Sequence, residues 1–374
     1  MNKPLRVVHI SLGHNPTDDR IFYKEARSLA KSGYQVTVVA PDCEKVTEKD
    51  GVRFGLYKGK SYLRNMLCAY RTALKQHADI YHLHEFELLP FGIWLKYKYK
   101  RKVIYDAHET IFWYFIDFSR RSMFIKMPLA IFAQVLEWIG LMFVNHVITV
   151  TPQVAEGFRP FQKKIDLVYN YPLLNFFSVP HQPDEKHPII LYHGHIVPAR
   201  NIELMISAMR FVKAIDNRAR LILVGDLSNW YWQKLEALVL TLDLINTIQF
   251  QPAIPYVEIP NLISQASIGL SSMIVNESGK RSIQVKPFEF MAMGIPVLGV
   301  NVPSIVNYVV ESGAGLIVDP LTPENLADRI LYLLQNPAVR KTMGDHGRRA
   351  VQKRYNWNTT LPALLKVYQE LSEC

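Results

Sequence analysis

The stretch VKPFEFMAMGIPV, which spans Val285–Val297, is the most specific segment of the chain. Apolar residues recur at helical spacing up to Gly294 and a short apolar run follows, which predicts a helix over Lys286–Met293 and a strand over Pro296–Val300. The predicted helix begins at Lys286-Pro287, and the first backbone amides of a helix have no partner within it. These amides are expected beside the lysine and the carboxylate of Glu289. This cluster suits a phosphate and a hydroxyl-bearing ring, whereas an ordinary helix-strand unit explains only the apolar residues.

The rest of the second half repeats the alternation of short strand-like runs and longer helical runs. The predicted strands are Ile189–His193, Leu221–Val224, Thr247–Gln251, Ile268–Ser272 and Gly315–Asp319. The predicted helices are Ile202–Val212, Trp230–Leu242, helices from Pro323 onward and a last helix over Thr359–Leu371. The loop Val275–Val285 has no readable periodicity.

The first half shows the same alternation of strand-like and helical runs. Its predicted strands are Leu5–Ile10, Gln35–Ala40, Val52–Tyr57, Asp79–His84, Lys102–His108, His146–Thr151 and Ile165–Asn170. Its predicted helices are Arg20–Lys31, Tyr62–Lys75, Leu88–Tyr99 and Phe124–Phe143. Strands that alternate with helices indicate a parallel sheet covered on both faces.

A proline-rich stretch interrupts this pattern near residues 171–188. We therefore predict two doubly wound, Rossmann-like α/β domains: residues 1–172, a linker at 173–187, and residues 188–357. The helix at 358–374 can pack on either domain. Such domains bind ligands at the carboxyl ends of their strands, so we expect a ligand cleft where the two domains face each other.

Composition excludes several classes of protein. The chain has 374 residues, 49% of them hydrophobic and 20% charged, so it is neither disordered nor collagen-like. Its three cysteines, Cys43, Cys68 and Cys374, form no CxxC pair and are expected to be free thiols. The N-terminal run predicts a strand rather than a secretory signal. The longest charge-free stretch, Trp138–Ala155, is interrupted by polar residues, so we expect a soluble or peripheral protein.

Several catalytic motifs are missing from the sequence. No GxGxxG follows the first strand, and neither a P-loop nor a GxSxG nucleophile elbow occurs. The His82/His84 and His193/His195 pairs each place two imidazoles on one strand face, but spacing implies no third metal ligand, so we predict no metal site. No DxD triplet occurs either, and a bound diphosphate would need cations of the protein itself.

The positive charge belongs to the first half of the chain. Residues 1–180 carry 25 Lys and Arg against 16 Asp and Glu, so they hold +9 of the total net charge of +10. This charge is compatible with nucleic acid, with anionic lipid or with an ordinary solvated surface. No nucleic-acid-binding module accompanies it, so we expect no nucleic-acid partner.

KPFEFMAMGIPVLG resembles the donor-binding signature K-x-F-E-Y-M-A-x-G-x-P-V of the family 4 glycosyltransferases, which have the two-domain GT-B fold. Five further segments agree in order and extend the resemblance over nearly the whole chain: DDRIFYKEARSLAKSGYQVTVVAP, DIYHLHEFELLP, VIYDAHE, ILYHGHIVPARNIELMISAM and LILVGD. The resemblance implies a metal-independent and retaining glycosyltransferase without a cofactor. The donor that the resemblance implies is a UDP- or GDP-linked sugar.

The resemblance also implies roles for individual residues. Glu289 should bind the ribose hydroxyls, Lys286 and Arg200 should bind the diphosphate, and His108 should lie beside the transferred sugar as the catalytic residue. Gly13 should let backbone amides approach the diphosphate. The remaining donor-side residues are Gly194, His195, Arg281, Pro287 and Phe288, and the acceptor-side residues are Asp19, Arg20, His84 and Glu85. Asp19 and Arg20 also fit the N-cap of the first helix.

The sequence departs from the family pattern at two positions. Many members carry two glutamates with seven residues between them, but Arg281 stands where the first is expected. Either Glu277 substitutes for that carboxylate, or Arg281 recognises an acidic sugar. His195 stands where the family usually has Arg, which allows a proton-dependent phosphate contact or none.

The first domain is expected to take the acceptor, a lipid-linked or oligosaccharide molecule. The segments Lys58–Lys75, Lys96–Lys102 and Thr110–Met127 mix basic and aromatic residues, which favours docking on an anionic membrane surface; the alternative for Phe124–Phe143 is a buried helix pair. We therefore expect a cytoplasmic enzyme, peripheral on the inner face of the membrane, in bacterial surface polysaccharide or glycolipid synthesis. The alternatives are a non-catalytic nucleotide-sugar-binding subunit and a sugar-nucleotide epimerase.

Overall fold

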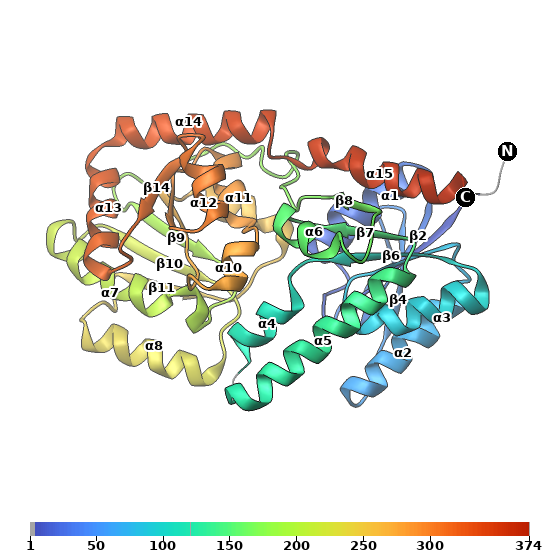
Figure 1. The fold of residues 1–374 in the computed structure, drawn as a ribbon. Coiled ribbons are helices and arrows are strands. Elements are labelled where there is room, and N and C mark those ends of the chain that lie inside the picture. Colours follow the sequence, from blue (N-terminus) through green and yellow to red (C-terminus); the bar gives the residue numbers. More distant parts are fainter. Residues whose placement is uncertain (1–3, 120, 374) are drawn as a thin grey trace. The chain divides into compact units, whose positions relative to one another are not determined.

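The computed structural model describes residues 4–119 and 121–373, which form two compact units (Figure 1). Unit 1 comprises residues 1–170 and 357–374, and unit 2 comprises residues 171–356. The chain thus passes from unit 1 to unit 2 and returns for its last helix. Arg120, within the predicted membrane-docking segment, and Cys374, a predicted free thiol, lie outside the described residues.

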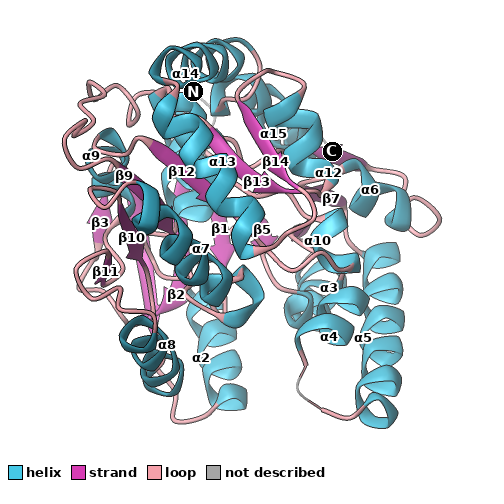
Figure 2. Cartoon of the chain, turned by 90° about the vertical axis from the view of Figure 1, so that its left-hand side faces the viewer, coloured by secondary structure: helices cyan, strands magenta, loops and turns pink. Residues whose placement is uncertain are grey.

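Unit 1 is built on a sheet in the order β3-β4-β2-β1-β5-β6-β7-β8, parallel except for the β3–β4 pair. Figure 2 distinguishes the helices and strands of the chain by colour. Its strands are β1 (Arg6–Ile10), β2 (Gln35–Pro41), β3 (Glu48–Lys49), β4 (Val52–Tyr57), β5 (Ile80–Leu83), β6 (Lys102–Ala107), β7 (His146–Thr149) and β8 (Ile165–Leu167). Its helices are the π-helical η1 (Asp19–Ala26), α1 (Arg27–Lys31), α2 (Tyr62–Lys75), the 3₁₀ turn η2 (Phe86–Leu88), α3 (Leu89–Tyr99), α4 (Ile111–Phe118), α5 (Met123–Phe143), α6 (Pro152–Phe158) and α15 (Trp357–Glu373).

Unit 2 is a second, wholly parallel sheet in the order β11-β10-β9-β12-β13-β14. Its strands are β9 (Ile189–His193), β10 (Arg220–Val224), β11 (Ile248–Gln251), β12 (Ile268–Ser271), β13 (Val297–Val300) and β14 (Gly315–Val318). Its helices are η3 (Pro198–Arg200), α7 (Ile202–Ile215), α8 (Asn229–Thr241), η4 (Tyr256–Glu258), α9 (Ile259–Ser264), α10 (Glu277–Arg281), α11 (Lys286–Met293), α12 (Pro303–Ile305), η5 (Val306–Val310), α13 (Pro323–Gln335) and α14 (Pro337–Lys353).

The two faces of the unit 1 sheet differ in polarity. Side chains alternate along a strand, so Val8 and Ile10 of β1 enter an apolar core, while His9 points to the opposite face. The parallel register places His9 beside His82 of β5, and Asp106 lies on β6, the next strand of the sheet. Three polar side chains therefore meet in the interior, a juxtaposition that no single strand reveals.

The predicted linker is part of unit 2. His181 bonds to the carbonyl oxygen of Ala266 at 2.9 Å, and Glu185 forms an ion pair with Arg340 at 2.7 Å. These contacts hold residues 173–187 against the second unit rather than leaving them as a free connection. The short helices α4, α6 and α10 were not predicted, because five to eight residues give too few repeats to define a helical face.

Helix α14 packs on α11, and a glycine makes this contact possible. A Cβ atom on Gly344 of α14 would lie 1.9 Å from the carbonyl oxygen of Gly294, the residue that ends α11 in the left-handed conformation (φ 74°). Backbone atoms cannot yield to such an overlap as a flexible side chain can. Gly344 therefore fixes the position of the helix that carries the predicted donor-binding residues.

The substitution Gly344→Ala should destabilise the protein by at least about 1–3 kcal/mol, because the added methyl group overlaps backbone. The matched control is Gly157→Ala, in α6, where a Cβ meets no atom within 4 Å. This control should leave the free energy of unfolding unchanged or raise it by up to about 1 kcal/mol. Urea unfolding followed by circular dichroism measures both variants, and equal effects would contradict the proposed packing.

Candidate functional site

The first group of predicted residues lies at the carboxyl edge of the unit 2 sheet. Strand β9 pairs with β10 on one side and β12 on the other, so the order of connections reverses there. Open α/β sheets bind their ligands at this kind of switch point. Gly194 follows β9 directly, and the loop after β12 leads through α10 to the start of α11.

Gly194 and Lys286 are in direct contact at this edge. Gly194 has φ 120°, and a Cβ atom on it would lie 2.1 Å from Cε and 2.6 Å from Nζ of Lys286. Only glycine combines this backbone conformation with room for the lysine. The Lys286 side chain therefore crosses the end of β9 and brings its ammonium group to the switch point.

Glu289 lies in the first turn of α11, where the helix dipole favours a negative charge. It is 5% exposed, and its Oε2 lies 3.4 Å from Nε2 of His193. Burial and the nearby charge of Lys286 lower the pKa of His193 to about 3, so this imidazole is neutral at physiological pH. A lysine and a carboxylate from the same helix thus stand at the same strand end.

Arg200 belongs to the same edge. It ends η3, and the next residue, Asn201, donates a hydrogen bond from Nδ2 to Ser272 Oγ at 2.9 Å. This bond ties η3 to the loop after β12. His195 is largely exposed, with Nδ1 3.9 Å from Asp226 Oδ2. Partial desolvation of its ring and the charge of Lys286 lower its pKa. The structure thus brings Gly194, His195, Arg200, Lys286 and Glu289 to one edge of one sheet.

Three predicted donor residues have other surroundings. Phe288 is buried among the rings of Tyr171, Tyr308 and Tyr355, with centroid distances of 5.0–5.6 Å. Its role is therefore to hold α11 in the core, and a direct donor contact by its ring does not fit this burial; the preceding Pro287 is buried at the helix start as well. Arg281 Nη2 lies 3.2 Å from Glu277 Oε2, so the two residues proposed as alternatives pair with each other.

The second group lies at the carboxyl edge of the unit 1 sheet, around His108. Its Nε2 lies 3.4 Å from Asp106 Oδ2 and 3.4 Å from His84 Nδ1. Asp106 is fully buried, and although burial raises its pKa, the charge of Arg20 outweighs that effect and holds the pKa well below the usual range. His108 is thus held by a permanently ionised carboxylate at the strand end.

The loop after β1 completes this edge. Glu85 accepts hydrogen bonds from Ser11 Oγ at 2.6 Å and from the Gly13 amide at 3.2 Å. The His14 ring stacks on His108 with centroids 5.7 Å apart, and its Nδ1 lies 3.0 Å from Asp18 Oδ2. Burial lowers the pKa of His14, but the hydrogen bond and charge of Asp18 outweigh it and raise the pKa to about 9. A cationic imidazole thus lies beside His108.

The predicted capping role of Asp19 and Arg20 is wrong. Asp18 is the N-cap of η1, and its side chain accepts hydrogen bonds from the amides of Arg20 and Ile21. Asp19 instead pairs with Lys24 at 2.9 Å. Arg20, predicted on the acceptor side, is buried and pairs with Asp106, so it positions the strand end and does not face the acceptor. His84 is buried in the same way.

Sequence reasoning missed Asp106, His14 and Asp18. Asp106 stands two residues before His108 and points to the same face of β6, a period-two signal that was available. The ion pair between His14 and Asp18 gave no comparable signal, because it depends on how the loop after β1 folds back.

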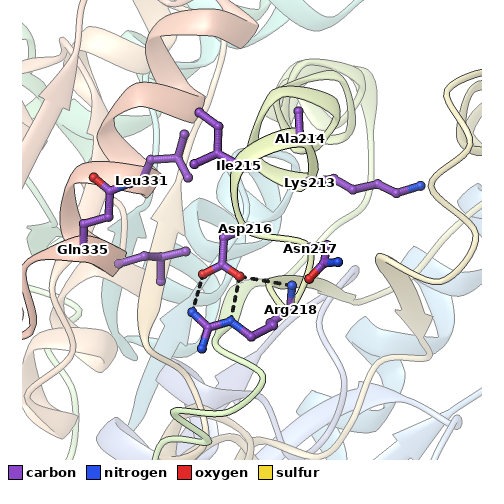
Figure 3. A pocket seen from close by; sticks show the side chains of 9 residues that line it. Lys213, Ala214, Ile215, Asp216, Asn217, Arg218, Leu331 and Gln335 are labelled. Atoms are coloured by element: carbon purple, nitrogen blue, oxygen red, sulfur yellow. Dashed lines mark hydrogen bonds and ion pairs between the residues drawn. The ribbon is translucent and has the colours of Figure 1, made fainter.

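The hollows found in unit 2 lie elsewhere. One, of about 440 Å³, is lined by the end of α7, the end of α13 and the loop before β10, where Asp216 and Arg218 form a bidentate ion pair (Figure 3). Another, of about 460 Å³, includes Ile189, Arg220 and Ile248, the first residues of their strands. Both therefore belong to the amino edge of the sheet, opposite the cluster around Lys286.

The substitution Asp18→Asn should lower the pKa of His14 from about 9 toward its ordinary value of 6.5, because asparagine keeps the capping oxygen but removes the charge. NMR titration of the His14 ring measures this change, with the exposed Asp42→Asn as control. Since the pKa of His14 is raised on folding, the pair stabilises the native state below about pH 6.5 and loses that contribution as the pH rises through about 9. An unchanged pKa in Asp18→Asn would contradict the assignment.

Two family models match the chain in succession. "Glycosyltransferase Family 4" matches residues 20–171, and "Glycosyl transferases group 1" matches residues 175–350. The two matches meet within a few residues of the division between the units. Each model therefore covers one of the two sheets.

Curated relatives match mainly over half of the chain. An uncharacterized glycosyltransferase of Methanocaldococcus jannaschii is 27% identical over 183 residues, which are 49% of this chain and 48% of the relative. A GDP-mannose-dependent monoacylated alpha-(1-6)-phosphatidylinositol monomannoside mannosyltransferase of Corynebacterium glutamicum is 25% identical over 49% of this chain and 47% of its own length. The chain thus matches about half the length of these relatives.

Solved structures share the fold over nearly the whole chain. Sucrose-phosphate synthase from Thermosynechococcus elongatus gives a TM-score of 0.78 at 20% identity, covering 99% of both chains. Anabaena HepE in complex with UDP-glucose gives a TM-score of 0.74 at 14% identity, covering 98% of this chain and 100% of the other. With both sheets matched by glycosyltransferase models and the whole architecture shared, this chain belongs to the family 4 glycosyltransferases and has the GT-B fold.

Proposed function

We propose that the protein transfers a sugar from a UDP- or GDP-linked donor to a lipid-linked or oligosaccharide acceptor. The observation that carries this proposal is the Lys286 ammonium group held over Gly194 at the switch point of unit 2, with the carboxylate of Glu289 in the same helical turn. A cation and a carboxylate at this edge are the groups that a diphosphate and a ribose require. Named relatives support the proposal, since one is GDP-mannose-dependent and one solved neighbour binds UDP-glucose.

The donor site is proposed to work without a metal ion. Lys286 and Arg200 bind the diphosphate and stabilise the negative charge that develops as the nucleoside diphosphate leaves. Glu289 accepts hydrogen bonds from the ribose hydroxyls. Lys286 and Arg200 then neutralise the diphosphate, as a metal ion bound to a DxD motif does in other enzymes. Added Mg²⁺ should therefore leave the transfer rate unchanged.

The acceptor is assigned to unit 1, at the edge formed by His14, Glu85 and His108. His108 is proposed to contact the transferred sugar, and Asp106 keeps its ring oriented. We propose transfer with retention of the anomeric configuration, and we name no covalent residue. Catalysis then rests on positioning and on stabilisation of the leaving group.

Variants of the donor site should separate binding from transfer. Lys286→Ala and Glu289→Gln should each weaken donor binding by about 10- to 100-fold, the cost of losing a hydrogen bond to a charged group. The matched control, Lys280→Ala, removes an exposed lysine that pairs with Glu277 and should bind normally. Calorimetry with a panel of UDP- and GDP-sugars measures the affinity. Binding without turnover for any acceptor would favour a non-catalytic nucleotide-sugar-binding subunit.

We further propose that unit 1 docks on a membrane through α5. The polar side chains Gln134 and Glu137 face inward, where Tyr105 donates a hydrogen bond to Glu137 at 2.7 Å. The opposite face exposes large apolar side chains: Phe124, Ile125, Leu129, Ile131, Phe132, Val135, Leu136, Ile139 and Met142. An exposed apolar face of this extent is typical of a protein or membrane contact.

The basic charge of residues 1–180 suggests which surface this face meets. A net charge of +9 on the same part of the chain favours an anionic leaflet, which fits a lipid-linked acceptor. By length and composition alone, α5 is also long and apolar enough to cross a membrane. Its most apolar 18 residues have a mean hydropathy of 1.5, and a third of them are buried. We therefore propose a cytoplasmic enzyme that is peripheral on the inner face of the membrane and acts in surface polysaccharide or glycolipid synthesis.

The double variant Phe124→Ser/Phe132→Ser should reduce binding to anionic vesicles at least about tenfold, because each exposed ring contributes about 1.5–3 kcal/mol when it enters lipid. The matched control, Ile215→Ser/Leu240→Ser, alters two exposed apolar residues of unit 2. Flotation with phosphatidylglycerol vesicles, compared with phosphatidylcholine vesicles, measures binding. Equal flotation of both double variants would contradict docking through α5.

A further inference from the structure

We propose that His9, His82, His84 and Glu25 form a buried site for a divalent transition-metal ion of the zinc class. The site lies in the interior of unit 1, apart from the cluster around Lys286. The proposal therefore goes beyond the proposed transfer reaction, and its test uses neither donor nor acceptor.

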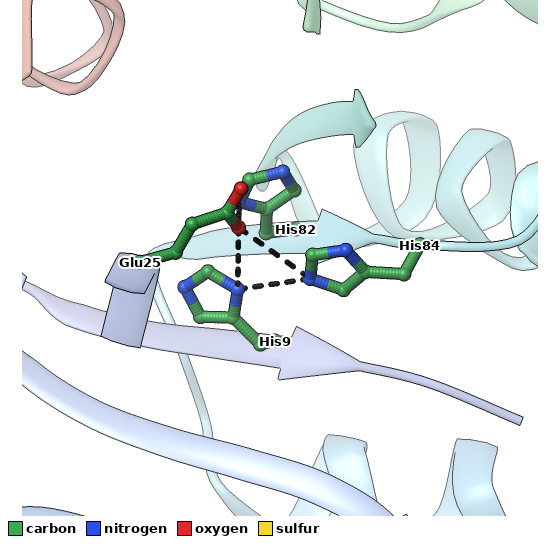
Figure 4. A group of neighbouring side chains, drawn as sticks. All are labelled: His9, Glu25, His82 and His84. Atoms are coloured by element: carbon green, nitrogen blue, oxygen red, sulfur yellow. Dashed lines mark hydrogen bonds and ion pairs between the residues drawn. The ribbon is translucent and has the colours of Figure 1, made fainter. Parts of the chain in front are cut away.

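The fold assembles these side chains from three segments. His9 of β1 is the direct register neighbour of His82 of β5, and His84 follows two residues later on the same face. Glu25 comes from η1, which packs over this face of the sheet (Figure 4). All four residues are buried, with exposed fractions of 0–4%.

The spacing of the ligand atoms fits a common centre. Glu25 Oε2 lies 3.7 Å from His9 Nδ1, 3.9 Å from His82 Nδ1 and 3.9 Å from His84 Nε2. These separations are too long for hydrogen bonds, and Oε2 accepts none from the described residues. Tetrahedral zinc with bonds of about 2.0–2.1 Å separates its ligands by about 3.4 Å. The four residues each offer one ligand atom such that these atoms all lie within 4.8 Å of one another.

The surrounding groups resemble the outer shell of a metal site. His84 turns its other nitrogen, Nδ1, toward Asp106 Oδ2 at 3.4 Å, and His9 turns Nε2 toward the Tyr368 hydroxyl at 3.4 Å. Glu25 Oε1 lies 3.0 Å from Arg20 Nε. Metal-binding histidines and carboxylates usually have such partners, which fix the tautomer and orientation of each ligand.

The type of donor atom indicates the class of ion. The buried cluster offers three imidazole nitrogens, from His9, His82 and His84, and one carboxylate, from Glu25. Three imidazoles and one carboxylate suit zinc and its neighbours, whereas calcium and magnesium prefer oxygen ligands.

A bound ion would replace two hydrogen bonds. His9 Nδ1 and His84 Nε2 lie 3.0 Å apart and share a proton, and Tyr368 lies 2.8 Å from His82 Nδ1. A proton on this cluster and a metal ion are therefore alternative occupants, and metal content distinguishes them.

The test measures zinc in the whole protein by mass spectrometry, after purification without an affinity metal and again after refolding from guanidinium with zinc or Co²⁺. We expect about one ion per chain and visible absorption bands of four-coordinate cobalt. The double variant His9→Asn/His82→Asn should hold less than about 0.1 ion. The matched control His146→Asn alters a buried histidine that pairs with Asp166 outside the cluster, and it should keep the ion.

Circular dichroism establishes that each variant is folded before its metal is counted. The proposal would be overturned if the wild-type protein is folded but holds no zinc, both as purified and after refolding with zinc. A proton between His9 and His84 would then be the occupant. If refolding fails, the metal content of protein from zinc-supplemented cells decides alone. Equal metal content in the double variant and His146→Asn would also overturn the assignment to these residues.

Discussion

The ion pair between Arg20 and Asp106 is the interaction on which the arrangement of unit 1 depends. Arg20 donates from Nε and Nη2 to the two carboxylate oxygens at 2.9 and 3.0 Å, and from Nη1 to the carbonyl oxygen of Val168 at 3.0 Å. It therefore joins η1, β6 and the segment after β8. Because both charges are buried, removal of Arg20 would cost about 3–5 kcal/mol, since the Asp106 carboxylate would lose its cation.

This pair also explains why a polar interior is tolerated. The carboxylate of Asp106 stays ionised and lies within 3.4 Å of both His84 and His108, so one fixed charge orients the buried histidines and the strand-end histidine together. The exterior of the same unit shows the opposite distribution, since α5 turns its acidic residue inward and Phe124 and Phe132 outward. Unit 1 thus buries charged and polar side chains, which costs stability, and exposes apolar side chains on α5. This pattern is typical of functional constraint rather than of packing alone.

Sequence periodicity predicted much of the fold because regular elements repeat a local signal. The helices Tyr62–Lys75 and Lys286–Met293 and the strand Ile189–His193 have the predicted bounds, and the lysine and glutamate of α11 lie at a sheet edge as expected. Local signals also failed in specific ways. Asp18 and Asp19 are equally good capping residues, and only the folded turn decides between them. The contact of Glu25 with three histidines joins residues up to 59 positions apart, which no local pattern encodes.

The return of α15 to unit 1 affects how the chain folds during synthesis. Trp357 is buried and donates a hydrogen bond to Ser28, and the buried Tyr368 bonds to His82, so the first unit lacks part of its interior until α15 has been made. Unit 2 is continuous in sequence and has no such requirement. The ribosome therefore completes the second unit before α15 can cover the first, and the half that begins the chain waits with the polar interior beneath α15 exposed.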